Sequence, residues 1–181
     1  IGVYAFKVAS FEITHIPLLK YLARLKLPIL LSTGMANIKE IREAVEAIEN
    51  EGEKRIALFH CGIQYPSSFD CVHLRCLGTL KKEFGCPVGY SDHTLGIAVA
   101  VAAVALGAKI YEKHITLKDG KSPDHDFALS VKEFADMVRA IRECELALGC
   151  GIKKVQNVEK VHLRRGRRSC VRPRGCPTRR S

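Results

Sequence analysis

The chain has 181 residues, 47% of them hydrophobic, which is enough for one domain with a buried core and excludes wholesale disorder. The net charge of +10 comes from the end of the chain, because residues 152–181 hold 11 Lys/Arg against one Asp/Glu, whereas residues 1–151 hold 18 of each. The longest apolar run, residues 95–108, is shorter than the roughly 20 residues that cross a bilayer. We therefore predict no membrane span and expect a cytoplasmic protein.

The chain is expected to divide near residue 150. Residues 1–150 have the composition of a folded domain, and residues 151–181 form a basic tail without aliphatic periodicity, which we expect to be disordered. Such a tail raises nucleic-acid binding as an alternative, but a truncated or frame-shifted end is favoured over an evolved arm. The start at Ile1-Gly2-Val3, with no Met and no signal segment, predicts that the chain is a fragment.

Five short apolar runs bounded by turn residues predict buried strands. In chain order they cover residues 4–9, 28–32, 55–61, 87–90 and 109–114. Stretches with helical spacing follow the strands. The clearest helix signals are two capping boxes, Asn37 with Glu40 and Ser130 with Glu133, each placed before an amphipathic stretch.

Strand and helix alternate about every 25 residues, which predicts parallel strands joined by right-handed crossovers. Either a TIM barrel or an open doubly wound sheet fits this order. Polar residues follow the carboxyl end of every predicted strand, where a TIM barrel carries its chemistry, whereas an open sheet gathers them at one switch point. We therefore predict an α/β fold that is a partial TIM (β/α)8 barrel, with five of its eight βα units.

His93 and His114 lie at the carboxyl ends of two consecutive predicted strands. Neighbouring parallel strands lie only about 4.8 Å apart, so the two imidazoles are close enough to share one ion. Two imidazoles without an acidic cage leave positions for water and substrate oxygens, which suits a Lewis-acid divalent metal. The alternative is a pair of hydrogen-bonded interior histidines.

The first predicted strand carries a second set of candidates. Lys7 lies inside it and Ser10 at its end, which suits an anionic substrate group, although a lysine that extends to solvent gives the same pattern. Glu12 is on the same side as Ser10 if the strand continues, so it is a candidate acid or base. Asp124, in the loop after His114, is a similar candidate, and it is equally typical of an ordinary turn.

Several of these segments resemble the sialic acid synthases, a family that includes N-acetylneuraminate, legionaminic acid and pseudaminic acid synthases and spore-coat polysaccharide relatives. The matching segments are 7–12 (KVASFE), 31–35 (LSTGM), 60–66 (HCGIQYP), 88–96 (VGYSDHTLG), 112–114 (EKH) and 122–125 (SPDH). They occur in the same order, and the resemblance covers about residues 1–150. Where relatives usually have a polar pair before the Tyr-Pro, this chain has Ile63-Gln64.

The resemblance implies an enzyme that condenses phosphoenolpyruvate with an N-acetylated amino-sugar aldehyde, giving a nonulosonic acid and phosphate, with Mn or Mg as the usual metal. We expect a homodimer of the full-length protein and no membrane partner, and a nucleic-acid partner is disfavoured. By position, the metal ligands are His93 and His114, the substrate contacts are Lys7, Ser10, Ser32, Tyr65 and Ser91, and the catalytic groups are Glu12 and Asp124. The chain would supply the C-terminal part of the barrel, so we expect impaired activity from it alone.

Two other functions stay open at this point. A Schiff-base aldolase on the same barrel would use Lys7 or Lys113 as its nucleophile. A non-catalytic fragment would bind nucleic acid through the basic tail, with an affinity that falls steeply with salt.

Overall fold

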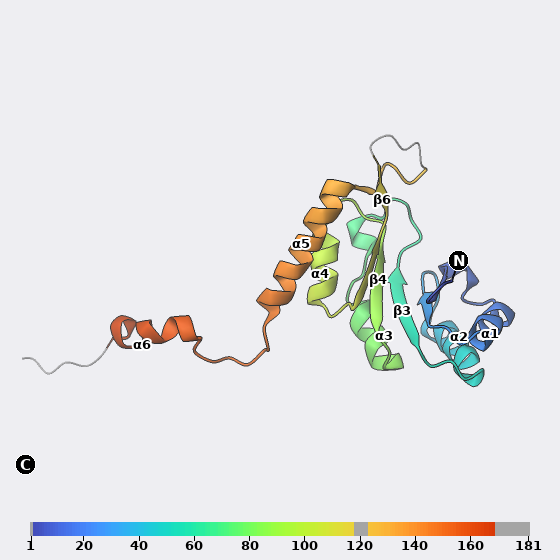
Figure 1. Ribbon diagram of the computed structural model, residues 1–181, viewed down its shortest axis with the longest axis horizontal. Helices are drawn as coiled ribbons and strands as arrows, with labels where there is room; N and C mark the ends of the chain where they lie inside the picture. The colour runs from blue at the N-terminus through green and yellow to red at the C-terminus, as the bar shows by residue number, and fades with distance from the viewer. Residues whose placement is uncertain (1, 118–122, 169–181) are drawn as a thin grey trace, which may run out of the picture. The chain divides into compact units, whose positions relative to one another are not determined.

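The computed structural model of the protein describes residues 2–117 and 123–168. Contacts divide the chain after Gly149 into two units, residues 1–149 and 150–181, which are taken separately. The expected strands and helices all lie in the first unit (Figure 1).

The first unit contains one parallel sheet of five strands in sequential order, β1-β2-β3-β4-β5. The strands are β1 (Phe6–Val8), β2 (Ile29–Ser32), β3 (Ile56–Cys61), β4 (Val88–Asp92) and β5 (Ile110–Lys113). Right-handed crossovers between parallel strands that never reverse their order place every helix on the same face of the sheet. A doubly wound sheet needs a reversal of that order, so the topology confirms the barrel prediction.

Five helices follow the strands, and two of them begin as predicted. They are α1 (Ile16–Arg24), α2 (Ile38–Asn50), α3 (Cys76–Phe84), α4 (Ala98–Ala105) and α5 (Val131–Leu148). At the start of α2, the Asn37 side chain accepts from the Glu40 amide while the Glu40 carboxylate accepts from the Asn37 amide. Ser130 and Glu133 form the same reciprocal pair at α5. Each box satisfies amide groups that a helix start leaves without partners.

The core lies between the sheet and these helices. It is built from alternate residues of each strand together with the apolar faces of the helices, including Val8, Leu31, Leu58, Val88, Leu19, Ile48 and Leu80. Because successive side chains of a strand point to opposite faces, the residues between these positions point away from the helices. That second face carries Lys7, Ser32, Ser91 and Glu112.

The sheet curls around its second face. Strands β1 and β5 are four spacings apart, which is about 19 Å in a flat sheet at about 4.8 Å per spacing. Even so, Lys7 Nζ of β1 lies 3.3 Å from Glu112 Oε2 of β5. Two side chains meet across that span only if the sheet bends toward them, as the strands of a TIM barrel do. The five strands therefore form an arc of a barrel wall with the polar face inside.

After β5 the chain makes a small addition that the sequence did not predict. Strand β6 (Ile115–Thr116) pairs in parallel with β7 (Leu129–Ser130). The amide of Leu129 donates to the carbonyl of His114 at 2.9 Å. This pairing brings residues 124–130 back beside the end of β5.

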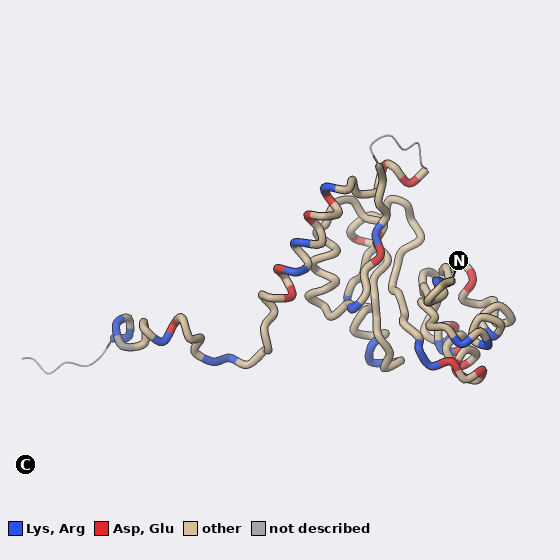
Figure 2. Tube along the Cα trace, viewed as in Figure 1, with Lys and Arg blue, Asp and Glu red and all other residues tan. Residues whose placement is uncertain are grey.

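The described part of the second unit holds a 3-10 turn, η3 (Asn157–Glu159), and a short helix, α6 (Lys160–Gly166), where the sequence predicts no regular structure. A Gln156–Glu159 capping box starts the turn, with the Gln156 amide donating to the Glu159 carboxylate at 2.7 Å. Basic residues outnumber acidic ones along this segment (Figure 2). The arginines at 172, 174, 179 and 180 lie outside the described residues. Among the described residues, no helix is long and apolar enough to cross a membrane.

Candidate functional site

A polar cluster occupies the concave face of the sheet. Lys7 Nζ donates to Ser32 Oγ at 2.7 Å and lies 3.3 Å from Glu112 Oε2. Ser91 Oγ donates to the other Glu112 oxygen at 2.6 Å. These four side chains come from β1, β2, β4 and β5, so the curl of the sheet is what assembles them. Lys7 and Glu112 are each about one-third exposed, at 33% and 39%, so an anion in solution can reach the ammonium group.

Ser10 lies beside this cluster in the turn η1 (Ser10–Glu12), where it is buried. Its Oγ accepts from the Gly34 amide at 3.0 Å and lies 3.1 Å from Cys61 Sγ. A Cβ at position 34 would lie 2.8 Å from that oxygen, so the close approach of the two loops requires glycine. Ser10 thus joins the ends of β1, β2 and β3.

His93 and His114 lie together, with ring centroids 5.3 Å apart and ring planes at 67°. His93 Nδ1 lies 3.1 Å from the Gly62 carbonyl, and His114 Nδ1 lies 3.0 Å from Asp124 Oδ2. A carbonyl and a carboxylate only accept hydrogen bonds, so both Nδ1 atoms must carry the proton. In neutral rings, the lone pair then lies on Nε2 of each histidine.

Aromatic rings enclose the two imidazoles. The Tyr65 ring lies 4.0 Å from that of His93, and Phe127 lies 5.0 Å from His114, all between ring centroids. Burial lowers the pKa of His93, and the neighbouring His114 lowers it further. Burial likewise raises the pKa of the Tyr65 hydroxyl, so the phenol stays protonated at neutral pH. The surroundings therefore favour a neutral His93 imidazole, the form that binds metals.

These observations fit a divalent metal. Metal-binding histidines generally donate their second ring nitrogen to a carbonyl or carboxylate, as both histidines do here. Within residues 2–117 and 123–168, no group of three or more His, Cys, Asp or Glu side chains has a metal-binding arrangement. Two imidazoles would therefore need oxygen ligands from water or substrate, which is the open type of site seen in catalysis.

The structure brings most of the predicted site residues together, but not Glu12. Strand β1 ends at Val8 and the chain turns into η1, so Glu12 does not follow Ser10 on the face of a continued strand. Its carboxylate instead lies 3.2 Å from His15 Nδ1 at the surface. Asp124, by contrast, is placed against His114 by the β6–β7 pairing.

Two groups were missed as site residues. Glu112 connects Lys7 to Ser91 at the centre of the polar cluster, and Phe127 packs on His114. The signal for Glu112 was present in the sequence: it lies two residues before His114 on the same strand, so both point to the same face. No comparable signal marks Phe127, because its position depends on the β6–β7 pairing.

Lys113 is not available as a Schiff-base nucleophile. Its side chain is fully buried, and Nζ lies 2.7 Å from Asp92 Oδ2, whose side chain is also fully buried. A nucleophilic amine must be uncharged and must reach the substrate. A buried ammonium paired with a carboxylate meets neither condition.

Known proteins share both the sequence and the fold. The NeuB family model matches residues 1–153. The N,N'-diacetyllegionaminic acid synthase of Campylobacter jejuni is 45% identical over 94% of this chain and 52% of its own length. The spore coat polysaccharide biosynthesis protein SpsE of Bacillus subtilis is 44% identical over 83% of this chain and 41% of its own.

Among solved structures, the N-acetylneuraminic acid (sialic acid) synthetase of Leptospira borgpetersenii, crystallised with citrate, superposes with a TM-score of 0.82 at 34% identity. The match covers 91% of this chain and 57% of that one. The chain spans about half the length of the curated relatives it matches. With its sequence matched over residues 1–153 and its barrel arc superposed on a sialic acid synthetase, the chain belongs to the NeuB family.

Proposed function

We propose that this chain forms the C-terminal part of a synthase barrel that condenses phosphoenolpyruvate with the aldehyde of an N-acetylated amino sugar, giving a nonulosonic acid and phosphate. The observation that carries the proposal is the meeting of two sites on two adjacent strands. Strand β4 contributes Ser91 and leads to His93, and β5 contributes Glu112 and leads to His114. The polar cluster around Ser91 and Glu112 suits an anion, and the two histidines suit a metal. The proposed reaction needs both sites.

The anion site would hold phosphoenolpyruvate. Lys7 Nζ and the hydroxyl groups of Ser10, Ser32 and Ser91 supply one positive charge and three donors for carboxylate or phosphate oxygens. In the free protein, Glu112 holds the Lys7 ammonium group on the concave face. Tyr65, half exposed above the histidines, is placed to contact the sugar.

His93 and His114 would hold the metal through their Nε2 atoms, with Mn or Mg as the first candidates. When bound, a divalent ion supplies Lewis-acid polarisation of the sugar aldehyde. The protein keeps both rings in the required tautomer through Gly62 and Asp124. Phe127 and Tyr65 pack against the two rings.

The chemistry then needs orientation and proton transfer from the chain. Lys7 and the serines orient phosphoenolpyruvate so that its C3 attacks the aldehyde carbon, whose oxygen takes up a proton. Water adds at C2 and gives up a proton to a carboxylate, for which Glu12 and Asp124 are the proposed groups. The C2–O bond then breaks and phosphate leaves with the bridging oxygen. Both carboxylates are 47% exposed, so each can exchange protons with solvent.

The position of bond cleavage tests the reaction. Phosphoenolpyruvate labelled with oxygen-18 in the bridging position is turned over by a complete barrel that contains this chain. We expect the label in inorganic phosphate, detected by the isotope shift of its phosphorus NMR signal. Label retained in the keto-acid product would contradict the mechanism, because it would require cleavage of the P–O bond.

Replacing His93 tests the metal site. In the same complete barrel, His93→Ala should remove both bound Mn and turnover, because one imidazole leaves the ion without half of its protein ligands. His73→Ala is the matched control, since His73 is an exposed histidine outside the site. Mn content equal to that of the unsubstituted protein in His93→Ala would show that the histidines do not bind the metal.

A further inference from the structure

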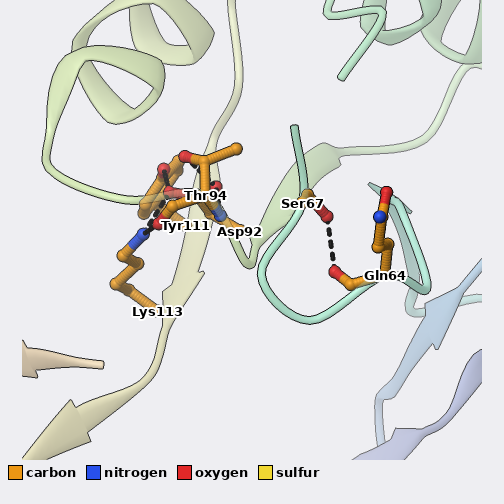
Figure 3. A network of polar contacts seen from close by, with 6 residues as sticks. All are labelled: Gln64, Ser67, Asp92, Thr94, Tyr111 and Lys113. Carbon is orange, nitrogen blue, oxygen red and sulfur yellow. Dashed lines mark hydrogen bonds and ion pairs between the residues drawn. The ribbon is translucent and has the colours of Figure 1, made fainter. Parts of the chain in front are cut away.

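A second ion pair, between Asp92 and Lys113, lies on the side of the sheet that faces the helices. Each of its two residues directly precedes one of the histidines. Asp92 Oδ2 accepts from Lys113 Nζ at 2.7 Å and from the Tyr111 hydroxyl at 2.5 Å. Asp92 Oδ1 accepts from the amide and the hydroxyl of Thr94 at 2.8 and 2.7 Å. Lys113 Nζ also donates to the Thr94 carbonyl. Figure 3 shows these four side chains converging, and both ion-pair side chains are fully buried.

The register of the two strands links this network to both histidines. Asp92 and Lys113 are direct partners in the β4–β5 ladder, and Ser91 and Glu112 are the partners just before them. Side chains alternate between faces, so Asp92 and Lys113 point toward the helices while their neighbours point into the barrel. Each histidine directly follows one member of the buried pair. A single contact between the strands thus fixes the backbone from which both rings project.

His93 is also held from the opposite side. The Ser67 amide donates to the His93 carbonyl at 2.9 Å, and Ser67 Oγ donates to the Gln64 carbonyl at 2.7 Å, closing the turn that carries Tyr65 (Figure 3). The Gly62 carbonyl accepts from the His93 ring in the same loop. The histidine therefore lies between the loop after β3 and the buried network.

We propose that the buried network of Asp92, Thr94, Tyr111 and Lys113 is a positioning device that sets the affinity of the His93–His114 site for a divalent ion. This inference rests on the proposed metal-binding function. The Asp92 carboxylate has four donors, two on each oxygen, and they come from both strand ends. Loss of one donor would leave the strands paired but free the segment around His93 to shift, which would change the distance between the two rings.

Position 94 offers the sharpest test, because Thr94 is fully buried and does not belong to the proposed metal ligands. Thr94→Val keeps the shape of the side chain and removes the hydroxyl donor, whereas Thr94→Ser keeps the donor. Co²⁺ is titrated into the full 181-residue chain, and its visible absorption gives affinity and ligand field without any activity assay. We expect Thr94→Val to weaken Co²⁺ binding by about 10- to 100-fold, the usual effect of groups that orient metal ligands. Thr94→Ser should bind nearly as tightly as the unsubstituted chain.

Tyr111→Phe provides a second variant, since it removes one other donor to Asp92 and leaves the ion pair intact. Glu53→Gln is the control, because it disrupts a different ion pair, with Arg55, just before β3 begins and away from the histidines. All affinities are measured well below the melting temperature of each variant, so loss of folded protein does not contribute.

The outcomes separate the two proposals. If the unsubstituted chain binds no Co²⁺, the proposed metal site is wrong and the positioning role falls with it. If the unsubstituted chain binds Co²⁺ and Thr94→Val and Tyr111→Phe bind it equally well, even with lower melting temperatures, the network is structural only. Weakened binding in both variants, an altered Co²⁺ spectrum and normal binding in Thr94→Ser and Glu53→Gln would establish the positioning role.

Discussion

Strand β5 carries two neighbouring charged residues that take part in two different ion pairs. Glu112 pairs with Lys7 on the concave face, where both side chains are about one-third exposed and 3.3 Å apart. Lys113 pairs with Asp92 on the helix side, where both are fully buried and 2.7 Å apart. Because neighbouring side chains of a strand point to opposite faces, two adjacent residues form one ion pair that solvent reaches and one that is buried.

The environments give the pairs different roles. Water and dissolved anions can reach Lys7, so that pair contributes little to stability and the charge of Lys7 stays accessible. The Asp92 carboxylate is saturated by four donors and has no contact with solvent, so that pair serves to hold the two strands in place. Because successive side chains of β5 point to opposite faces, Glu112 belongs to the accessible cluster and Lys113 to the buried pair that holds the strands together.

Single substitutions in the two pairs should affect stability very differently. Asp92→Ala leaves the Lys113 ammonium buried without a counter-charge, which costs about 3–5 kcal/mol of unfolding free energy. Glu112→Ala leaves Lys7 partly in water and still bonded to Ser32, but it also removes the acceptor of the Ser91 hydroxyl, so we expect a smaller loss of about 1–2 kcal/mol. Urea unfolding of both variants measures the difference.

A double variant sharpens the same comparison. Asp92→Leu combined with Lys113→Met replaces the buried pair by apolar groups, which often restores the stability that a single substitution removes. Similar urea midpoints for Asp92→Ala and Glu112→Ala would contradict the claim that the buried pair contributes more to stability than the exposed pair. A double variant no more stable than Asp92→Ala would mean that lost hydrogen bonds, rather than the unpaired charge, carry the effect.

The sequence was sufficient for the strands, because each is a short apolar run between turn residues, and for the two capping boxes. It also predicted that the two histidines lie close together, since both follow strands that are consecutive in the chain. The predicted placement of Glu12 beside Ser10 on a continued strand is wrong, because β1 ends at Val8 and a 3-10 turn redirects the chain there. The Asp92–Lys113 pairing was beyond reach, because it depends on the exact register of β4 and β5.

The position of Asp124 shows a similar limit. In the sequence it follows Pro123 and is typical of a turn, and that interpretation is correct as far as it goes. Its contact with His114 depends on strands of only two residues, β6 and β7, which have no recognisable sequence pattern. Such short pairings form because the rest of the barrel places their backbones side by side.

The exposed pair, Lys7–Glu112, should affect substrate binding, whereas the buried pair, Asp92–Lys113, should affect stability. In a complete barrel that contains this chain, Lys7→Met removes a charge-assisted hydrogen bond to the substrate anion. A bond of this kind contributes about 1.5–3 kcal/mol, so phosphoenolpyruvate should bind roughly 10- to 100-fold more weakly. Isothermal titration calorimetry measures the affinity, and the urea midpoint should change little.

Lys109→Met is the matched control for this substitution, because Lys109 is exposed at the other end of β5. It removes the same charge from the same sheet and should leave the affinity unchanged. If both variants lose affinity equally, the effect comes from net charge and not from the concave cluster.

A third pair, between Glu53 and Arg55, extends the comparison to an intermediate case, in which one partner is buried and the other is exposed. The Glu53 side chain is buried, at 3% exposed, while Arg55 is 60% exposed. Hydrogen bonds from the Arg55 side chain lower the pKa of Glu53 from 4.5 to about 2, against the opposing effect of burial. Since the ionised carboxylate is buried and accepts three hydrogen bonds from Arg55, Glu53→Gln should cost about 1–3 kcal/mol at neutral pH.

The pH dependence of this pair has a definite sign. As pH falls below 4.5, Glu53 takes up a proton in the unfolded chain before it does so in the folded protein, whose pKa is about 2. The stability from this group is therefore fully present above pH 4.5 and is lost as pH falls toward 2. Urea midpoints of the unsubstituted chain and Glu53→Gln, measured from pH 7 to pH 2, should differ most above pH 4.5 and converge near pH 2. A difference that stays constant over this range would show that the ionised carboxylate contributes nothing, whereas Glu46→Gln, on the exposed face of α2, controls for loss of a surface charge.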